Sequence, residues 1–448
     1  MGSIKKISDF TPLRWLPAML VFVVIAYYLW FVFQHALNIP QGDDITDILL
    51  TIIRTEKAED SGEFLAAFLA QLNDHRTVPS RMVYWLSYKL QGEINFRSLT
   101  FLANAGLLLL FSMLVIMTRQ VKSRWWILLC AAFLLFQIRA YHLTLWPMAA
   151  FAYFYVFVYG IASLCCLHRV TGARFFAAVV FATLCTFNLA SGQVIWLVGF
   201  ASLFLQAVIS KRISVYYLPA WLFAAATVLY GWRIGMETPN TITEVLRLFL
   251  QTPLHHCHYL LSLLGSAVSE KSVTMAAIAG AVMLGFLLLS TVRHFRHGDL
   301  RLELSCWFIV FSAIALALGR APYSSLEYAL VSRYSFPSVV LLTFCCVLIA
   351  SRFFSDKPKL ILLTAITAAV YCVSSYRIYS PPLQSKAEVR VQRFNRGNFR
   401  IFGTPIAKSN TIVAEAVAKG VYTPPDRPYP RPVIATRSNA EEKASKKR

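Results

Sequence analysis

The sequence predicts an all-α fold, a polytopic bundle of membrane-spanning helices, and two observations support this prediction. The 448 residues are 57% hydrophobic and only 15% charged, whereas a soluble domain is nearer half apolar and a quarter charged. The apolar residues also gather in uninterrupted runs. About 20 helical residues suffice to cross a hydrocarbon core of roughly 30 Å, so we expect the chain to cross a membrane many times.

Eleven segments qualify as spans, at residues 15–34, 99–117, 125–138, 147–167, 174–190, 193–209, 214–232, 273–292, 303–319, 336–351 and 358–376. The first lacks an A-x-A-like exit, so we interpret it as a retained span rather than a signal peptide. Residues 248–268 would make a twelfth span and would reverse the sidedness of everything after them. Three histidines near the start of that segment favour an interfacial or re-entrant segment instead.

Lysines and arginines concentrate in alternate linkers, and this orients the bundle. The basic linkers, together with the amino terminus, are residues 118–124, 167–174, 210–212, 292–301 and 351–359. An excess of Lys and Arg marks the cytoplasmic side. The opposite side then carries the tail and residues 35–98, 139–146, 188–193, 233–272 and 320–335.

Two segments are expected outside the membrane. Loop 35–98 contains three helix-like pieces, the second with Ser61 as N-cap and Glu63 in its first turn. Such amphipathic helices lie flat on a membrane surface. We divide the chain into a membrane domain, 1–376, and a basic soluble tail, 377–448, with 15 Lys and Arg against 5 Asp and Glu. The tail is predicted to hold one short helix stopped by Gly420 and to end in a disordered SNAEEKASKKR.

Charge and cysteine content exclude several other classes. The net charge of +21 fits a partnership with anionic membrane lipid, and no pattern of a nucleic-acid-binding fold accompanies it. Eight of the nine cysteines lie in apolar runs without a CxxC pair, so we predict neither a disulfide framework nor a structural zinc.

Three carboxylates, Asp43, Asp44 and Asp47, stand just outside the first span. One interpretation is a solvated turn followed by a helix start, where Asp is favoured. The other is a general base or metal ligand, because adjacent carboxylates at a partly desolvated surface raise each other's pKa. Nothing in the sequence fixes which of Asp43 and Asp44 faces inward, and we take Asp44 as the first choice.

Several basic residues on the same side are candidates for binding an anion. His75 and Arg76 precede a helix that Pro79 is expected to initiate, and Arg320 and Arg333 stand at the two mouths of a hairpin. A guanidinium forks onto phosphate oxygens. The alternatives are a polar loop cap for the first pair and snorkelling helix ends for the second.

The segment LHHCH offers a different chemistry. His255 and His258 share a helical face and would allow a divalent metal to bind. Packing in the aromatic belt of the interface is the alternative that we favour, and we predict no metal site.

This arrangement resembles the GT-C class of membrane glycosyltransferases. The resemblance rests on the acidic pair after the first span, the long first external loop, the eleven spans, and the pieces QGDD (41–44), NDHRTVPSRM (73–82), LLSLLGSAV (260–268) and SRY (332–334). Within the class, size and layout are similar to the pilin arabinofuranosyltransferases and to phage-type O-antigen glucosyltransferases.

The resemblance implies a function in a bacterial inner membrane, with the active site on the periplasmic face. A sugar, such as D-arabinofuranose, would move from a polyprenyl-phosphate donor to a protein or glycan acceptor, with inversion. Asp43 or Asp44 would be the base, and Arg76, Arg320 and Arg333 would hold the donor phosphate. Substrate contacts would come from Asp47, His75, Tyr334, His255 and His258. A flippase for a lipid-linked sugar is the rival from another class, but it would need polar residues at the bilayer midplane.

Overall fold

The computed structural model describes residues 15–209, 211, 213–237, 242–295, 299–399 and 405–425. Within these ranges the chain is helical, and its only β pairing is an isolated bridge between Leu72 and His75. The predicted all-α class is therefore confirmed. The segment SNAEEKASKKR lies outside the described residues.

Eight helical segments in the described ranges are long and apolar enough to cross a membrane. They are α1 (Leu16–His35), α5 (Phe96–Met117), α8 (Pro147–Leu167), the run η3–α10–η4 (Ala190–Val194, Ile195–Phe204, Leu205–Ile209), α14 (Val273–His294), α15 (Arg301–Arg320), α16 (Phe336–Phe353) and α17 (Pro358–Asn395). The other three predicted spans are also helices, namely α6 (Arg124–Leu135), α9 (Gly172–Thr186) and α11 (Tyr217–Arg233), but they are shorter. A multi-pass bundle is thus supported, and the count of eleven stays a prediction.

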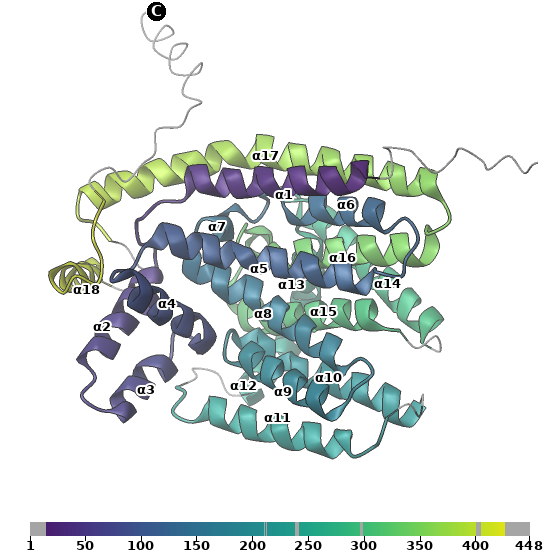
Figure 1. Cartoon of the computed structure of the whole chain (residues 1–448), viewed down its shortest axis with the longest axis horizontal. Coiled ribbons are helices and arrows are strands. Elements are labelled where there is room, and N and C mark those ends of the chain that lie inside the picture. The colour runs from purple at the N-terminus through teal and green to yellow at the C-terminus, as the bar shows by residue number, and fades with distance from the viewer. Residues whose placement is uncertain are drawn as a thin grey trace, which may run out of the picture.

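The short helices of the first external loop gather at one end of the bundle. Figure 1 shows α2 (Leu50–Lys57), α3 (Ser61–Leu69) and α4 (Val78–Gln91) on the left, together with α18 (Ile406–Ala418). Along the top edge α1 and α17 run side by side. The Tyr376 ring of α17 packs 5.2 Å from the Phe31 ring of α1, between ring centroids.

The predicted cytoplasmic linkers meet one another in the fold. Lys122 pairs with Asp356 at 3.2 Å, and Arg352 donates to the backbone oxygen of Asp299. Gln206, beside linker 210–212, donates to the backbone oxygen of Leu167 at 2.9 Å. The grouping of these linkers on one side, which came from charge alone, is consistent with these contacts.

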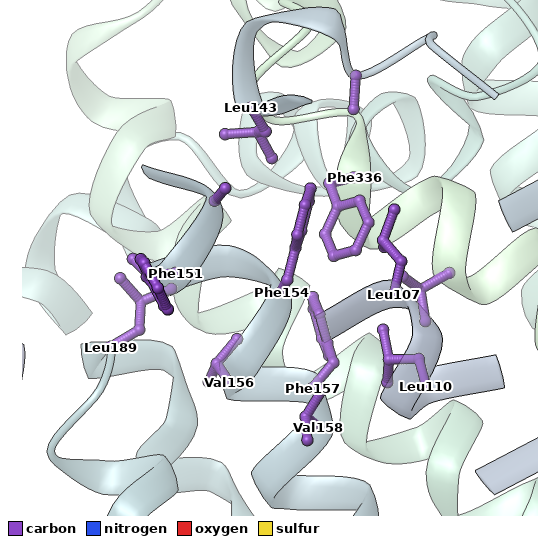
Figure 2. Close-up of a cluster of buried hydrophobic side chains, with 14 of the residues drawn as sticks. Leu107, Leu110, Leu143, Phe151, Phe154, Val156, Phe157, Val158, Leu189 and Phe336 are labelled. Carbon is purple, nitrogen blue, oxygen red and sulfur yellow. The ribbon is translucent and has the colours of Figure 1, made fainter. Parts of the chain in front are cut away.

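Helix α8 occupies the centre of the bundle. In its most apolar window 72% of the residues are buried, against 28% for α1 and for α17. Figure 2 shows Phe154 and Phe157 of α8 beside Phe336 of α16, with the Phe154 and Phe336 ring centroids 4.5 Å apart. The position of α8 matters for the site because its first turn contacts Asp44, in the acidic loop that carries Asp43 and Asp44.

The segment that we interpreted as interfacial or re-entrant forms α12 (Ile242–Gln251) and α13 (Pro253–Gly265). The 13 residues of α13 span about 20 Å, less than the roughly 30 Å of a hydrocarbon core. The helix packs closely on α14, since a Cβ on Gly265 would stand 1.8 Å from the Ala276 oxygen. This short helix favours the re-entrant interpretation.

Two local predictions about helix starts were wrong by one residue. The N-cap of α3 is Asp60, not Ser61, because extended Asp60 accepts from the Glu63 backbone N–H at 2.7 Å. Helix α4 begins at Val78, so Pro79 is its second residue. The predicted stop in the tail is confirmed, since α18 ends at Ala418 and Gly420 has φ +68°.

The predicted boundary at residue 376 does not coincide with a helix end. Helix α17 runs on for 19 residues through Pro381 and Pro382. Each proline removes one backbone hydrogen bond, but Tyr379, Leu383 and Ala387 are buried against the protein. This packing keeps the chain helical where its composition had indicated the start of a separate tail.

The length of α17 gives a prediction about sidedness. Its 38 residues extend about 57 Å, well beyond a hydrocarbon core of roughly 30 Å. In a Cys257→Ser background, cysteines placed at Ser61 and Ser385 should therefore be labelled from one side of the membrane and a cysteine at Lys359 from the other. Labelling of Ser385 from the Lys359 side would mean that α17 does not cross.

Candidate functional site

A buried ion pair organises the first external loop. Asp47 lies on η2 (Ile45–Leu49), and its Oδ1 accepts from Arg81 Nε and Thr77 Oγ1 at 2.8 and 2.7 Å. The Asp47 and Arg81 side chains are 0% and 2% exposed. Arg81 Nη2 lies 2.8 Å from the same Asp47 oxygen, and Nη1 donates to the backbone oxygens of Phe68 and Ala70. One guanidinium thus joins η2, α4 and the end of α3. Asp47 lies in the first turn of η2, as the helix-start interpretation expected. The substrate contact predicted for Asp47 is wrong for this structure, because its side chain is fully buried in the pair with Arg81.

The loop before η2 presses Asp44 against the start of α8. Gly42 adopts φ +54°, and a Cβ there would stand 3.1 Å from the Trp146 ring. This turn lets Asp44 Oδ2 accept from the Gln41 backbone N–H at 2.8 Å and Oδ1 from that of Met148 at 3.1 Å. Both carboxylate oxygens are therefore occupied. Burial raises the pKa of Asp44 to about 8, although these N–H groups oppose the shift.

Asp43, the neighbouring residue, has a different environment. It is half-buried, and its carboxylate forms no hydrogen bond or ion pair within the described part of the chain. Burial raises the pKa of Asp43, the charge on Asp47 adds to the increase, and the charge on Arg333 opposes it. Of the three carboxylates, this one is available to a substrate.

Of the two predicted hairpin arginines, Arg333 contacts tyrosines and acts electrostatically on Asp43. Arg333 donates to the Tyr328 hydroxyl, and its guanidinium carbon lies 4.8 Å from the centroid of the Tyr334 ring. Both Arg320 and Arg333 act electrostatically on Tyr334 and on Tyr259. The Tyr259 hydroxyl is buried without a hydrogen-bond partner among the described residues. Arg333 thus lies against the tyrosines of its own hairpin, and its charge also acts on the unpaired Asp43 carboxylate.

The other predicted basic pair separates. Arg76 is 6% exposed and donates to the backbone oxygen of Ile234, so it braces the loop that follows α11. His75 lies near Arg320, and burial lowers the pKa of His75 to about 4 while Arg320 acts in the same direction. His75 is therefore neutral at pH 7, and the charge of Arg320 acts on it. Arg76 instead bonds to the end of α11.

The histidines of α13 differ in their contacts. His255 Nε2 lies 3.0 Å from the Ala321 oxygen and 3.2 Å from the Ser324 oxygen, so it fixes the hairpin to α13. His258 is half-buried and has no hydrogen bond with another candidate residue in the described ranges. Within those ranges no group of three or more His, Cys, Asp or Glu side chains is placed to hold a metal ion.

Beside Gly42 lies a cavity of about 370 Å³ that was not anticipated. It is lined by the turn before η2, by α7 (Tyr141–Thr144) and by the outer part of α17, meaning residues 377–395, which lie beyond the predicted boundary. Its polar lining consists of Gln41, Tyr141, His142, Ser385, Asn398, Lys386, Arg390 and Arg393. The last three follow the i, i+4, i+7 spacing of one helical face, a signal that was overlooked because the segment was assigned to a soluble tail.

Comparison with known proteins gives no match, whether to a protein-family model, a curated protein or a solved structure.

The ion pair predicts a large effect on stability. Removing one partner of a buried pair typically costs about 3–5 kcal/mol, whereas replacing both by apolar residues is often neutral. We expect Arg81→Met to lower the free energy of unfolding in mixed micelles by this amount, and Asp47→Leu with Arg81→Met to restore most of it. Lys122→Met, which breaks the exposed pair with Asp356, is the matched control and should change little. Equal effects of Arg81→Met and Lys122→Met would contradict the structural role.

Proposed function

We propose that this chain is an integral membrane glycosyltransferase that moves a sugar from a polyprenyl-phosphate carrier to an acceptor hydroxyl. The acceptor is a periplasmic protein such as pilin, or a surface glycan, and the enzyme works at the outer face of a bacterial inner membrane. The observation that supports this most directly is the half-buried Asp43 carboxylate, which is unpaired in the described structure and on which the charge of Arg333 acts.

The negative charge on Asp43 suits proton removal from the acceptor, and the positive charge on Arg333 suits departure of the phosphate. The acceptor oxygen attacks the anomeric carbon on the face opposite the phosphate, and its proton passes to the Asp43 carboxylate. The bond between that carbon and the phosphate oxygen breaks, and its electrons leave with the polyprenyl phosphate. Positive charge on Arg333 and Arg320 stabilises the departing phosphate. The raised pKa of Asp43 makes its carboxylate a better base than an exposed aspartate.

The geometry changes our choice between the paired aspartates. Asp44 was the first choice from the sequence, but both of its oxygens accept backbone N–H groups. To take a proton from a substrate it would have to leave the first turn of α8. We therefore assign the base to Asp43 and assign to Asp44 the positioning of the loop.

A transfer assay with purified protein and a polyprenyl-phosphate sugar tests this assignment. General-base assistance is typically worth about 10²–10⁴-fold in rate, so Asp43→Asn should lose that factor in kcat while donor binding persists. Asp44→Asn should lower thermal stability as well as turnover, because it removes one of two N–H acceptors. Near-normal transfer by Asp43→Asn would remove Asp43 as the base. Movement of the donor across vesicles without any transfer would favour a flippase.

The charge on Arg333 should be visible in the pH dependence. A base must be deprotonated, so turnover should fall on the acid side around the raised pKa of Asp43, above the ordinary aspartate value of about 3.9. Arg333 lowers that pKa. Arg333→Gln should therefore move the acid limb of the kcat profile to higher pH. Lys89→Gln, which removes an exposed charge paired with Glu56, is the control. An unmoved limb, or one moved to lower pH, would exclude this role.

A further inference from the structure

The outer part of α17 gathers three cations on one wall of the cavity beside Gly42. Lys386, Arg390 and Arg393 all line it. No carboxylate oxygen lies within 4 Å of these cations in the part of the chain that the structure describes. Like charges on one helical face repel one another, and the described part of the chain supplies no ion-pair partner that would offset the repulsion.

The polar groups of the cavity are already arranged by contacts with α7. Lys386 Nζ donates to Tyr141 Oη at 3.1 Å and meets His142 Nε2. Burial lowers the pKa of His142 to about 4, with Lys386 acting in the same direction. The ring is therefore neutral, accepts from the ammonium, and adds no negative charge. Arg390 Nη1 lies 3.5 Å from the Leu145 oxygen, which leaves most of its donors unused.

The carboxylate of Asp44 is a poor counter-ion for these cations. Asp44 acts electrostatically on Arg390, but both of its oxygens accept backbone N–H groups. The lining also includes apolar side chains, namely Ile39, Ile45, Leu383, Phe394 and Phe399. The cavity thus combines cationic donors with an apolar lining that could contact an organic group.

We propose that this cavity binds the phosphate group of a phosphate ester, held by Lys386, Arg390 and Arg393. Forked guanidinium donors match phosphate oxygens, and a volume of about 370 Å³ leaves room for part of the esterified group. The inference deepens the proposed function and rests on it only for the source of the ester, because the donor lipid and a soluble phosphate share this chemistry.

Binding to the purified full-length protein in detergent tests the proposal without any transfer reaction. The probes are a polyprenyl phosphate, a soluble sugar 1-phosphate and inorganic phosphate, each followed by calorimetry. Arg390→Gln and Lys386→Gln should weaken binding at least tenfold, and Arg390→Lys should weaken it less. Arg377→Gln is the matched control, because Arg377 is an exposed cation on the same helix outside the cavity. Thermal unfolding of each variant separates lost binding from lost folding.

The outcomes are distinguishable from those of the transfer assay. Binding of the polyprenyl phosphate alone supports the site and assigns the ester to the donor lipid. Binding of the soluble probes as well supports the site and assigns it to phosphate groups in general. Failure of every phosphate probe to bind, or equal binding by Arg390→Gln and Arg377→Gln, overturns it. Binding that depends on Arg390 in a protein that transfers no sugar would remove the proposed function and leave the phosphate site standing.

Discussion

The end of the bundle that carries η2, α3 and α4 depends on the buried pair between Asp47 and Arg81. Desolvating two charges is costly, and such a pair is tolerated only when hydrogen bonds satisfy the remaining donors and acceptors. Here Thr77 and two backbone oxygens supply most of those bonds, although Asp47 Oδ2 has no partner in the described structure. The Asp47 backbone N–H also bonds to the Asp43 oxygen at 2.8 Å. The pair therefore fixes not only three helices but also the turn that presents the acidic residues.

Adjacent residues in that turn acquire opposite roles because the backbone sends them to different surroundings. Asp44 meets the N-terminal turn of α8, where free N–H groups favour a carboxylate. Asp43 keeps a carboxylate that has no hydrogen bond in the described structure and on which the charge of Arg333 acts. Two identical side chains are thereby separated into an anchor and an available group. The same separation explains why neither spacing nor residue type could assign the base, since the decisive contact is made by Met148, 104 residues away.

What the sequence predicted well was local, and what it missed depends on distant contacts. Long apolar runs indicate helices because hydrophobicity and helix length are properties of the segment itself. All eleven predicted spans are helical for this reason. Arg76 looked like an anion clamp in its own loop, but the Ile234 carbonyl occupies part of its fork. The outer part of α17 looked like a tail because its prolines and charges mark composition, whereas the buried face of Tyr379, Leu383 and Ala387 exists only against the rest of the fold.

The carboxyl-terminal segment therefore belongs to the site rather than following it. Beyond α17 the chain returns to the first loop, where the Tyr422 hydroxyl donates to the Asn38 oxygen at 2.8 Å across 384 residues of sequence. The Ile94 N–H donates to the Val421 oxygen at 2.7 Å, and Lys57 pairs with Glu415 at 2.6 Å. The exposed pair adds little by itself, but Tyr422 is only 1% exposed and closes a packed surface. Both ends of the acidic loop are thus held by residues beyond the last span. A membrane bundle that ended at residue 376 would retain Asp43 but would lose both the cations of the cavity and the contacts that hold the loop against it.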